Sequence, residues 1–338
     1  MRVSGRIVAM PLAEVFTIAR GSQDVAEVVH VAIEHVGQVG WGEAAPIDRY
    51  DESVQSALAF VEEVELGDDP FALDEIQARL AELPGEHAAK AAIDAGLHDL
   101  CGKLVGLPVW RMLGHRRVGP PTSWTIPLDD PDSMARKAER TGSPFHRLKL
   151  KVGGGDGLDI ERVRAVSSVA RVPMQVDVNE WWTLDQALEA LPQLAELGVE
   201  YCEQPLPAGD PDGPELRRRS PVPIYVDEDC HTLADVAPCA ERAHGITIKL
   251  AKSGGIREAV RMAHAARALG LGVMLGCMIE SGLGISAGCQ VASLCDHVDL
   301  DGNLLLADDP CPGVELVEGI QVPPAAPGLG VQPATVPA

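Results

Sequence analysis

From about residue 120 onward, short β-rich runs alternate with helical stretches, and this alternation restricts the folds open to the chain. Parallel strands need a long crossover between them, which is usually a helix. Eight such runs separated by helices are typical of parallel strands closed into a barrel. We therefore predict an α/β protein with a (β/α)7β-type TIM barrel. The runs are SWTIPL, HRLKLKV, VPMQVDVN, GVEYCEQP, VPIYVDED, GITIKLAK, LGVMLGCMIE and HVDLDG.

The first part of the chain follows another pattern, with strand-like runs before helical ones. VAEVVHVAIEHVGQVGWGEAAP predicts two antiparallel strands joined at a turn near Gly37, and HAAKAAIDAGLHDLCGKLVG predicts a helix. Such a segregated order is typical of an α+β domain. We expect an N-terminal α+β domain over residues 1–115, the barrel over 116–310, and a C-terminal segment over 311–338 that packs back on the first domain.

The charge balance excludes some partners. The 338 residues include 50 acidic and 28 basic side chains, a net charge of −22, which repels nucleic acid and anionic membrane surfaces. The eight cysteines form no CxxC pair, and the N-terminus lacks the apolar run of a signal peptide. We expect a cytoplasmic protein that acts on a small molecule. The oligomeric state stays open, and a homo-oligomer is one of the alternatives.

Acidic residues recur at the ends of successive predicted strands. Asp177, Glu203, Asp227 and then Lys252 follow one another at intervals of 26, 24 and 25 residues. The carboxyl ends of barrel strands meet on one face, so three carboxylates would converge there and would need a cation between them. An all-oxygen ligand set favours Mg²⁺ over Zn²⁺. The alternative for each acid is a helix N-cap.

The run HRLKLKV places two lysines on one face of a strand. Lys149 and Lys151 alternate with Leu148 and Leu150, and residues two apart share a face. A core gains nothing from two adjacent ammonium groups, whereas a cation site flanked by lysines can use one of them as a base. With Lys252 taken as the end of a later strand, lysines would flank the cation from opposite sides. The alternative is that the pair lies on an exposed edge strand.

Together these motifs resemble those of a known enzyme family. KLK, DVN, EQP, DED and AKSGG resemble the muconate lactonizing enzyme subgroup of the enolase superfamily, and GWGEAAP and PGLGV extend the resemblance over nearly the whole chain. It implies that residues 1–115 form a capping domain and that the enzyme removes a proton next to a carboxylate. The implied Mg²⁺ ligands are Asp177, Glu203 and Asp227. The other implied roles are Lys149 on the substrate carboxylate, Lys151 and Lys252 as bases on opposite faces of the α-carbon, and Asn179 and Glu228 as orienting groups.

The last predicted strand bears on the substrate. Asp299 and Asp301 in HVDLDG share a face, and paired carboxylates suit a substrate ammonium. Their placement resembles that of the dipeptide epimerases, which implies inversion at the C-terminal residue of an L,L-dipeptide. The alternative for the pair is a turn and a helix cap. Other reactions of the superfamily also stay open: a muconate cycloisomerase, an N-succinylamino acid racemase or o-succinylbenzoate synthase, and an amino-acid-derivative epimerase. A barrel that only binds a ligand is the non-enzymatic alternative.

Four further residues are predicted near the substrate or the ligands. Arg20 either meets an acidic substrate side chain or points outward. Glu280 and Ser281 either lie near the substrate carboxylate or form a structural hydrogen bond. Asp229 follows Glu228 where the family often has a small residue, which adds a carboxylate of undetermined role.

Overall fold

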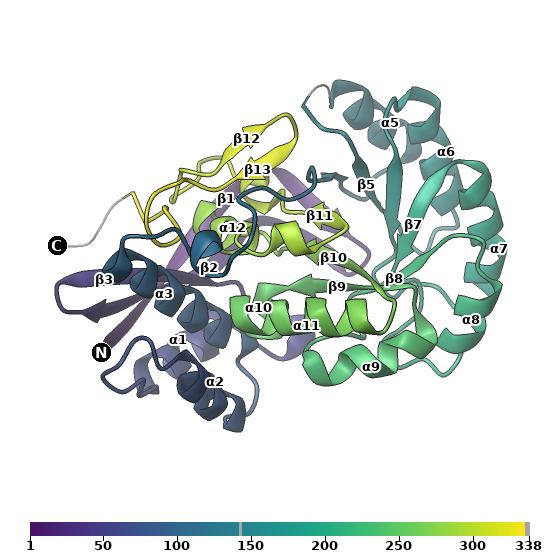
Figure 1. Cartoon of the computed structure of the whole chain (residues 1–338). Coiled ribbons are helices and arrows are strands. Elements are labelled where there is room, and N and C mark those ends of the chain that lie inside the picture. The colour runs from purple at the N-terminus through teal and green to yellow at the C-terminus, as the bar shows by residue number, and fades with distance from the viewer. Residues whose placement is uncertain (142–143, 335–338) are drawn as a thin grey trace.

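The computed structural model describes residues 1–141 and 144–334, and an eight-stranded parallel sheet forms its centre (Figure 1). The strands lie in chain order from β4 to β11. Thr122 pairs with Val298, and the Ser123 amide donates to the Val298 carbonyl at 2.9 Å, so the last strand returns to the first. All eight predicted strands are confirmed. Their bounds are β4 Trp124–Ile126, β5 Leu148–Lys151, β6 Met174–Asp177, β7 Val199–Glu203, β8 Ile224–Val226, β9 Gly245–Lys249, β10 Gly272–Gly276 and β11 His297–Asp299.

Helices connect the strands and cover the outside of the sheet (Figure 1). Most strand residues are buried, which agrees with the apolar residues that separate the polar ones in these runs. The predicted (β/α)7β fold class is confirmed. The helices are α5 Pro131–Arg140, α6 Asp159–Val169, α7 Leu184–Glu196, α8 Gly213–Arg219, α9 Leu233–Arg242, α10 Leu250–Ser253, α11 Ile256–Ala268 and α12 Gly282–Cys289, with 3-10 turns η2 Ala292–Leu294 and η3 Gly302–Leu305.

The N-terminal part is a three-stranded antiparallel sheet with helices on it. The elements are β1 Arg2–Ile18, β2 Gly21–His35, β3 Gln38–Ala44, η1 Asp48–Tyr50, α1 Val54–Glu63, α2 Leu73–Glu82, α3 His87–Val105 and α4 Val109–Met112. The turn at Gly37 has the left-handed φ of 77° that glycine tolerates. Helix α3 lies directly on β3, because a Cβ placed on Gly42 would come within 1.9 Å of the Ala92 carbonyl oxygen.

The chain after residue 310 contacts both parts of the molecule. A short hairpin, β12 Glu315–Val317 and β13 Ile320–Val322, is followed by a segment that pairs Gly328 with Pro108. Asp99 on α3 accepts a hydrogen bond from the Leu329 amide at 2.7 Å. The domain limits stay predictions, and residues 335–338 of the predicted C-terminal segment lie outside the described residues. No helix in the described ranges is both long and apolar enough to span a membrane.

One element differs from the sequence prediction. Strand β9 ends at Lys249, and Lys252 lies in the short helix α10, so the prediction that Lys252 ends this strand is wrong. The chain leaves the sheet three residues earlier than expected because the four residues after Lys249 form one helical turn. Gly254, at φ 93°, ends that turn.

Candidate active site

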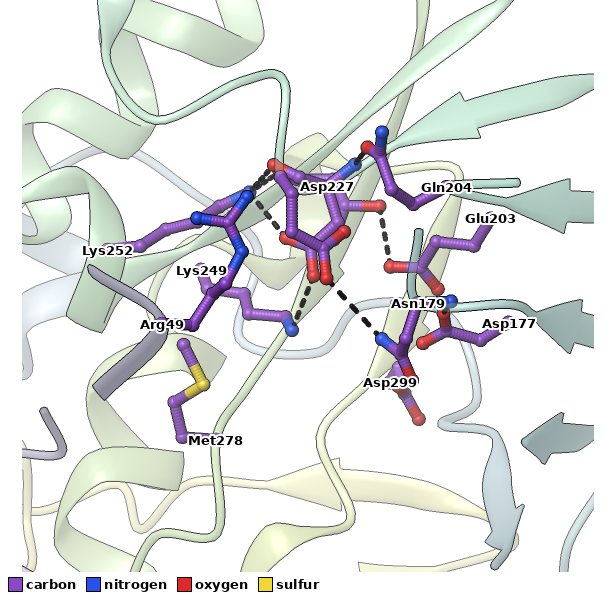
Figure 2. Close-up of polar contacts among 12 residues, drawn as sticks. Arg49, Asp177, Asn179, Glu203, Gln204, Asp227, Lys249, Lys252, Met278 and Asp299 are labelled. Carbon is purple, nitrogen blue, oxygen red and sulfur yellow. Dashed lines mark hydrogen bonds and ion pairs between the residues drawn. The ribbon is translucent and has the colours of Figure 1, made fainter. Parts of the chain in front are cut away.

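Three acidic side chains lie at the carboxyl ends of neighbouring strands. Asp177 ends β6, Glu203 ends β7, and Asp227 follows β8. Asp177 and Glu203 are paired in register, and Glu203 is paired with Tyr225 on β8. All three carboxylates are almost fully buried. Figure 2 shows Asp177 and Glu203 on one side of Asp227, and Lys249 and Lys252 on the other.

The two lysines of β5 contact these acids. Lys151 Nζ donates to Asp177 Oδ2 at 2.6 Å. Lys149 Nζ lies 3.1 Å from Asp177 Oδ2 and 2.6 Å from Glu203 Oε2. The edge-strand alternative is wrong, because β5 is an interior strand between β4 and β6 and both lysines are buried.

Lys249 and Lys252 both bind Asp227, but in different ways. Lys252 donates to Asp227 Oδ1, to the Asp227 carbonyl and to the Thr247 carbonyl, at 2.5 to 2.8 Å. An ammonium group has three donors, so Lys252 has none left for a substrate. Lys249 Nζ donates to Asp227 Oδ2 at 2.7 Å, the one hydrogen bond that its ammonium group makes among the described residues. Lys249 therefore keeps donors for another group.

The buried charges shift one another's pKa. Burial raises the pKa of the Asp177 and Asp227 carboxyls, but the adjacent lysines outweigh it and hold both pKa values below the ordinary range. The pKa of Glu203 is raised, because burial and the two neighbouring acids outweigh Lys149. Burial lowers the pKa of Lys149 and Lys249, yet the carboxylates around them raise both on balance. Lysine–acid pairing thus dominates the electrostatics of the site.

The residues fit a hard divalent cation by chemistry. Within residues 1–141 and 144–334, no three His, Cys, Asp or Glu side chains are already grouped as a metal site, since each carboxylate faces a lysine. The donors are nevertheless six carboxylate oxygens from consecutive strands, the type that Mg²⁺ prefers. Glu203 Oε2 is buried without a hydrogen-bond partner in the described chain, although Lys149 Nζ lies close to it. The ammonium group and this oxygen attract each other as charges, but their geometry does not make a hydrogen bond. The oxygen therefore lacks a hydrogen-bond donor, and a bound cation would take its place.

Asp299 and Asp301 adjoin this cluster. Asp299 ends β11, and its Oδ2 accepts from Lys149 Nζ at 2.8 Å. Its Oδ1 is buried and has no hydrogen-bond partner within the described ranges. Asp301 directly precedes η3 and accepts from the Thr125 amide at 2.7 Å. Burial, then the charge of Asp299, raises the pKa of Asp301 to about 7. The charges of the two carboxyls therefore act on each other, and Asp299 keeps one oxygen that has no hydrogen-bond partner among the described residues.

Asn179 and Glu228 link these acids to the capping domain. Asn179 Oδ1 accepts from Lys151 Nζ at 3.4 Å, and its Nδ2 donates to Glu228 Oε1 at 3.5 Å. Arg20, in the turn between β1 and β2, donates to the same Glu228 oxygen at 2.8 Å. Arg20 therefore points toward the strand ends, which answers the question of its direction. Burial first, then Asp227 and Asp177, raises the pKa of Glu228 to about 7.

Glu280 and Ser281 lie past the end of β10 and contact the capping domain. The Ser281 amide donates to Glu43 Oε1 at 2.8 Å, and its hydroxyl hydrogen-bonds Glu43 Oε2. Glu280 Oε1 accepts from the Met278 amide at 3.0 Å. Burial, then the charge of Glu43, raises the pKa of Glu280 to about 8. The structural hydrogen bond that was the alternative for Ser281 is therefore present.

Sequence reasoning missed three residues around the acids. Besides Lys249, Thr247 donates its hydroxyl to Glu203 Oε1 at 3.1 Å. Gln204 accepts from the Asp227 amide at 2.9 Å (Figure 2). The sequence did contain a clue to Lys249 and Thr247, because residues two apart in the run GITIK lie on the same face of a strand. Lys252 is three residues after Lys249 and would lie on the opposite face. Asp229 accepts from Arg242 Nη1 at 2.6 Å and from Gln204 Nε2 at 2.9 Å.

Two protein-family models match this chain. Residues 3–114 match the mandelate racemase/muconate lactonizing enzyme N-terminal domain, and residues 132–335 match the enolase C-terminal domain-like family. Both matches agree with the two structural parts described above.

Individual relatives cover nearly the whole chain. The L-Ala-D/L-Glu epimerase of Bacteroides thetaiotaomicron is 39% identical over 95% of this chain and 85% of its own. The substrate-liganded L-Ala-D/L-Glu epimerase of Bacillus subtilis superposes with a TM-score of 0.94 at 31% identity, covering 99% of both chains. The dipeptide epimerase of Enterococcus faecalis, complexed with Mg and L-Leu-L-Tyr, gives 0.92 at 31% identity over 98% of both. The chain belongs to the mandelate racemase/muconate lactonizing enzyme family of the enolase superfamily.

Proposed function

We propose that this protein is a dipeptide epimerase, an isomerase that inverts the α-carbon of the C-terminal residue of an L,L-dipeptide. The observation that carries the proposal is the buried Asp299, which ends β11 with one oxygen on Lys149 and the other without a partner among the described residues. A dipeptide brings an ammonium group to such an oxygen, whereas a dicarboxylate substrate brings none. Similarity to the epimerases named above supports the same reaction.

Asp177, Glu203 and Asp227 are the proposed ligands of Mg²⁺. The bound ion supplies positive charge that stabilises the substrate carboxylate as its α-proton leaves. The Mg-bound relative supports this assignment. Thr247 holds Glu203, and Lys252 and Gln204 hold Asp227 in place for this role. Asn179 and Glu228 orient the neighbouring lysine and acids.

Lys151 and Lys249 are the proposed pair of bases, and Lys249 replaces Lys252 in the role first predicted. Lys151 ends β5 and Lys249 ends β9, and they contact Asp177 and Asp227 from opposite ends of the row of acids. One lysine takes the proton from one face of the α-carbon, and the other returns a proton to the opposite face. Lys149 places positive charge at the substrate carboxylate.

The remaining assignments rest on proximity. Asp299 and Asp301 bind the substrate ammonium, and Arg20, Glu280 and Ser281 stay predicted substrate contacts. The eight free thiols and the net charge of −22 support a cytoplasmic location and a small-molecule substrate rather than nucleic acid. A homo-oligomer stays an expectation.

Isotope exchange tests the proposal. We would incubate the protein with Mg²⁺ and a library of L,L-dipeptides in D₂O and read deuterium uptake by mass spectrometry. We expect uptake at the C-terminal α-carbon of some dipeptides, with loss of uptake in EDTA. Uptake into N-succinylamino acids but into no dipeptide would contradict the dipeptide assignment and keep the superfamily chemistry.

A further inference from the structure

The carboxylate of Glu180 joins three separate segments beside the acid cluster. Arg49 in η1 donates to it twice, from Nε and Nη2, each at 2.7 Å. Arg20 Nη1, in the turn between β1 and β2, lies 3.2 Å from Oε2. The amide of Ala208, in the loop after β7, donates to Oε1 at 2.9 Å. Two capping-domain segments are thereby tied to the loops at the strand ends.

The backbone at Glu180 is unusual for a residue with a side chain. Asn179 and Glu180 have successive positive φ values of 49° and 73°, a region in which glycine is normally favoured. The Glu180 amide donates to the Gln204 carbonyl at 2.9 Å, which holds the loop in this conformation. Strained residues persist where their surroundings over-determine them, often at functional sites. The four contacts of its carboxylate give a reason for glutamate rather than glycine here.

We propose that Glu180 is a positioning residue that holds the Arg20 and Arg49 segments closed over the end of the barrel. It acts through the two arginines and does not touch the substrate. Arg20 in turn reaches Glu228, which is hydrogen-bonded to Asn179 beside the proposed ligand Asp177. The inference rests on the proposed function, because closure matters for a substrate that must enter and leave.

Partial exposure makes this contact suitable for opening and closing. The side chains of Arg49, Arg20 and Glu180 are 36%, 29% and 13% exposed, whereas the lysine–acid pairs below them are almost fully buried. Water can replace partly exposed ion pairs at less cost than buried ones, so they break more readily. We therefore expect the loss of Glu180 to change segment motion and substrate affinity more than thermal stability.

The test compares Glu180→Gln with Glu189→Gln, a control at an exposed position on α7. We would measure amide hydrogen exchange over residues 17–23 and 46–51 of the full chain in Mg²⁺, and kcat and KM for a dipeptide that is turned over. We expect exchange in both segments to rise about 10-fold and KM to rise about 5-fold in Glu180→Gln, with kcat and Tm nearly unchanged. The control should match the wild type in every measurement.

Unchanged exchange in both segments would overturn the inference, and so would a fall in kcat without faster exchange. A charge-swapped protein, Arg49→Glu with Glu180→Arg, should recover part of the protection if the pairing itself is responsible. A wild-type protein that epimerises no dipeptide would instead contradict the proposed function, and the exchange measurement would still decide the role of Glu180.

Discussion

Two lysines three residues apart show how position decides the role of a side chain. Lys252 is enclosed by Asp227 and the Thr247 carbonyl, so all its donors are used inside the protein. Lys249 makes one such bond. In the two-base mechanism the protonated lysine must direct an N–H at the α-carbon, and of these two lysines only Lys249 has an N–H that is not bonded inside the protein.

Replacing each lysine by alanine should separate these roles. We expect Lys249→Ala to lower isotope exchange about 10³-fold, because it removes a base, and to destabilise the protein less than Lys252→Ala does, because Asp227 keeps its contact with Lys252. Lys252→Ala should cost about 3–5 kcal/mol in unfolding free energy, because it leaves a buried carboxylate and two carbonyls without their donor. Thermal denaturation and exchange into the best dipeptide measure both effects. If Lys252→Ala stays fully stable and Lys249→Ala stays active, the roles are reversed.

Glu280 predicts a dependence of stability on pH. Its ordinary pKa is 4.5 and its folded pKa is raised to about 8, so the folded chain binds more protons between these values. Its contribution to stability therefore falls as the pH rises from about 4.5 to about 8. Glu280→Gln cannot ionise and keeps an acceptor for the Met278 amide. In EDTA, urea unfolding should show a smaller stability loss between pH 5 and pH 8 for this variant, by about 1–3 kcal/mol.

The control for this measurement is Glu196→Gln at an exposed position of α7. It should leave the pH dependence unchanged. Equal pH dependence in the Glu280→Gln and wild-type proteins would show that Glu280 is already ionised in the folded state.

At the scale of elements, the contact between β3 and α3 depends on missing side chains. A Cβ on Gly42 would lie 1.9 Å from the Ala92 carbonyl oxygen, and one on Gly40 would lie 2.1 Å from the Gly96 carbonyl oxygen. Backbone cannot move aside without shifting the whole helix. The glycines of GWGEAAP are therefore required by packing.

We expect Gly42→Ala to destabilise the protein by at least about 2–3 kcal/mol, because overpacking at a backbone contact separates the helix from the sheet. Gly5→Ala on β1 is the matched control, since its new methyl meets side-chain ends and no backbone, with Leu58 Cδ1 at 2.8 Å and methyls of Val61 and Val29 at 3.2 and 3.3 Å. Thermal unfolding compares them. Equal melting temperatures for both variants would mean that α3 is not held as closely as described.

The elements of the barrel were predictable because buried strands form short β-rich runs between helical stretches, and Asp177, Glu203 and Asp299 mark where three of these runs end. The turn α10 was not, because Leu250 and Ala251 extend the apolar run past the true end of β9 at Lys249. Contacts between residues far apart in the chain could not be predicted from the sequence either. Arg49 and Glu180 are 131 residues apart, and neither belongs to a periodic pattern that would place it.

At the scale of the whole molecule, the buried site is balanced in charge. Lys149, Lys151, Lys249 and Lys252 face Asp177, Glu203, Asp227 and Asp299. Burying charges of one sign alone would cost much free energy, whereas buried charges that are paired with opposite ones are tolerated. The paired lysines and carboxylates are thus compatible with folding before any cation binds.

Mg²⁺ should therefore stabilise the protein without being required for folding. At about 100-fold above its dissociation constant, a ligand of the folded state adds about 2.7 kcal/mol. For a chain of this size we expect Tm to rise by roughly 3–8 °C with Mg²⁺ and to fall back in EDTA. Asp177→Asn should lose the rise, and Asp229→Asn, whose carboxylate pairs with Arg242, should keep it. A rise that persists in Asp177→Asn would place the cation elsewhere.

The lysine–acid pairs have a practical consequence for anyone who prepares this enzyme. Many small zinc domains unravel when a chelator removes their metal, because the metal holds the fold together. Here the buried lysines neutralise the carboxylates, so protein stored with a chelator should stay folded. Without the ion it should not act on dipeptides. Adding the ion back would start the reaction at a chosen moment, which gives a clean zero time for rapid-mixing kinetics.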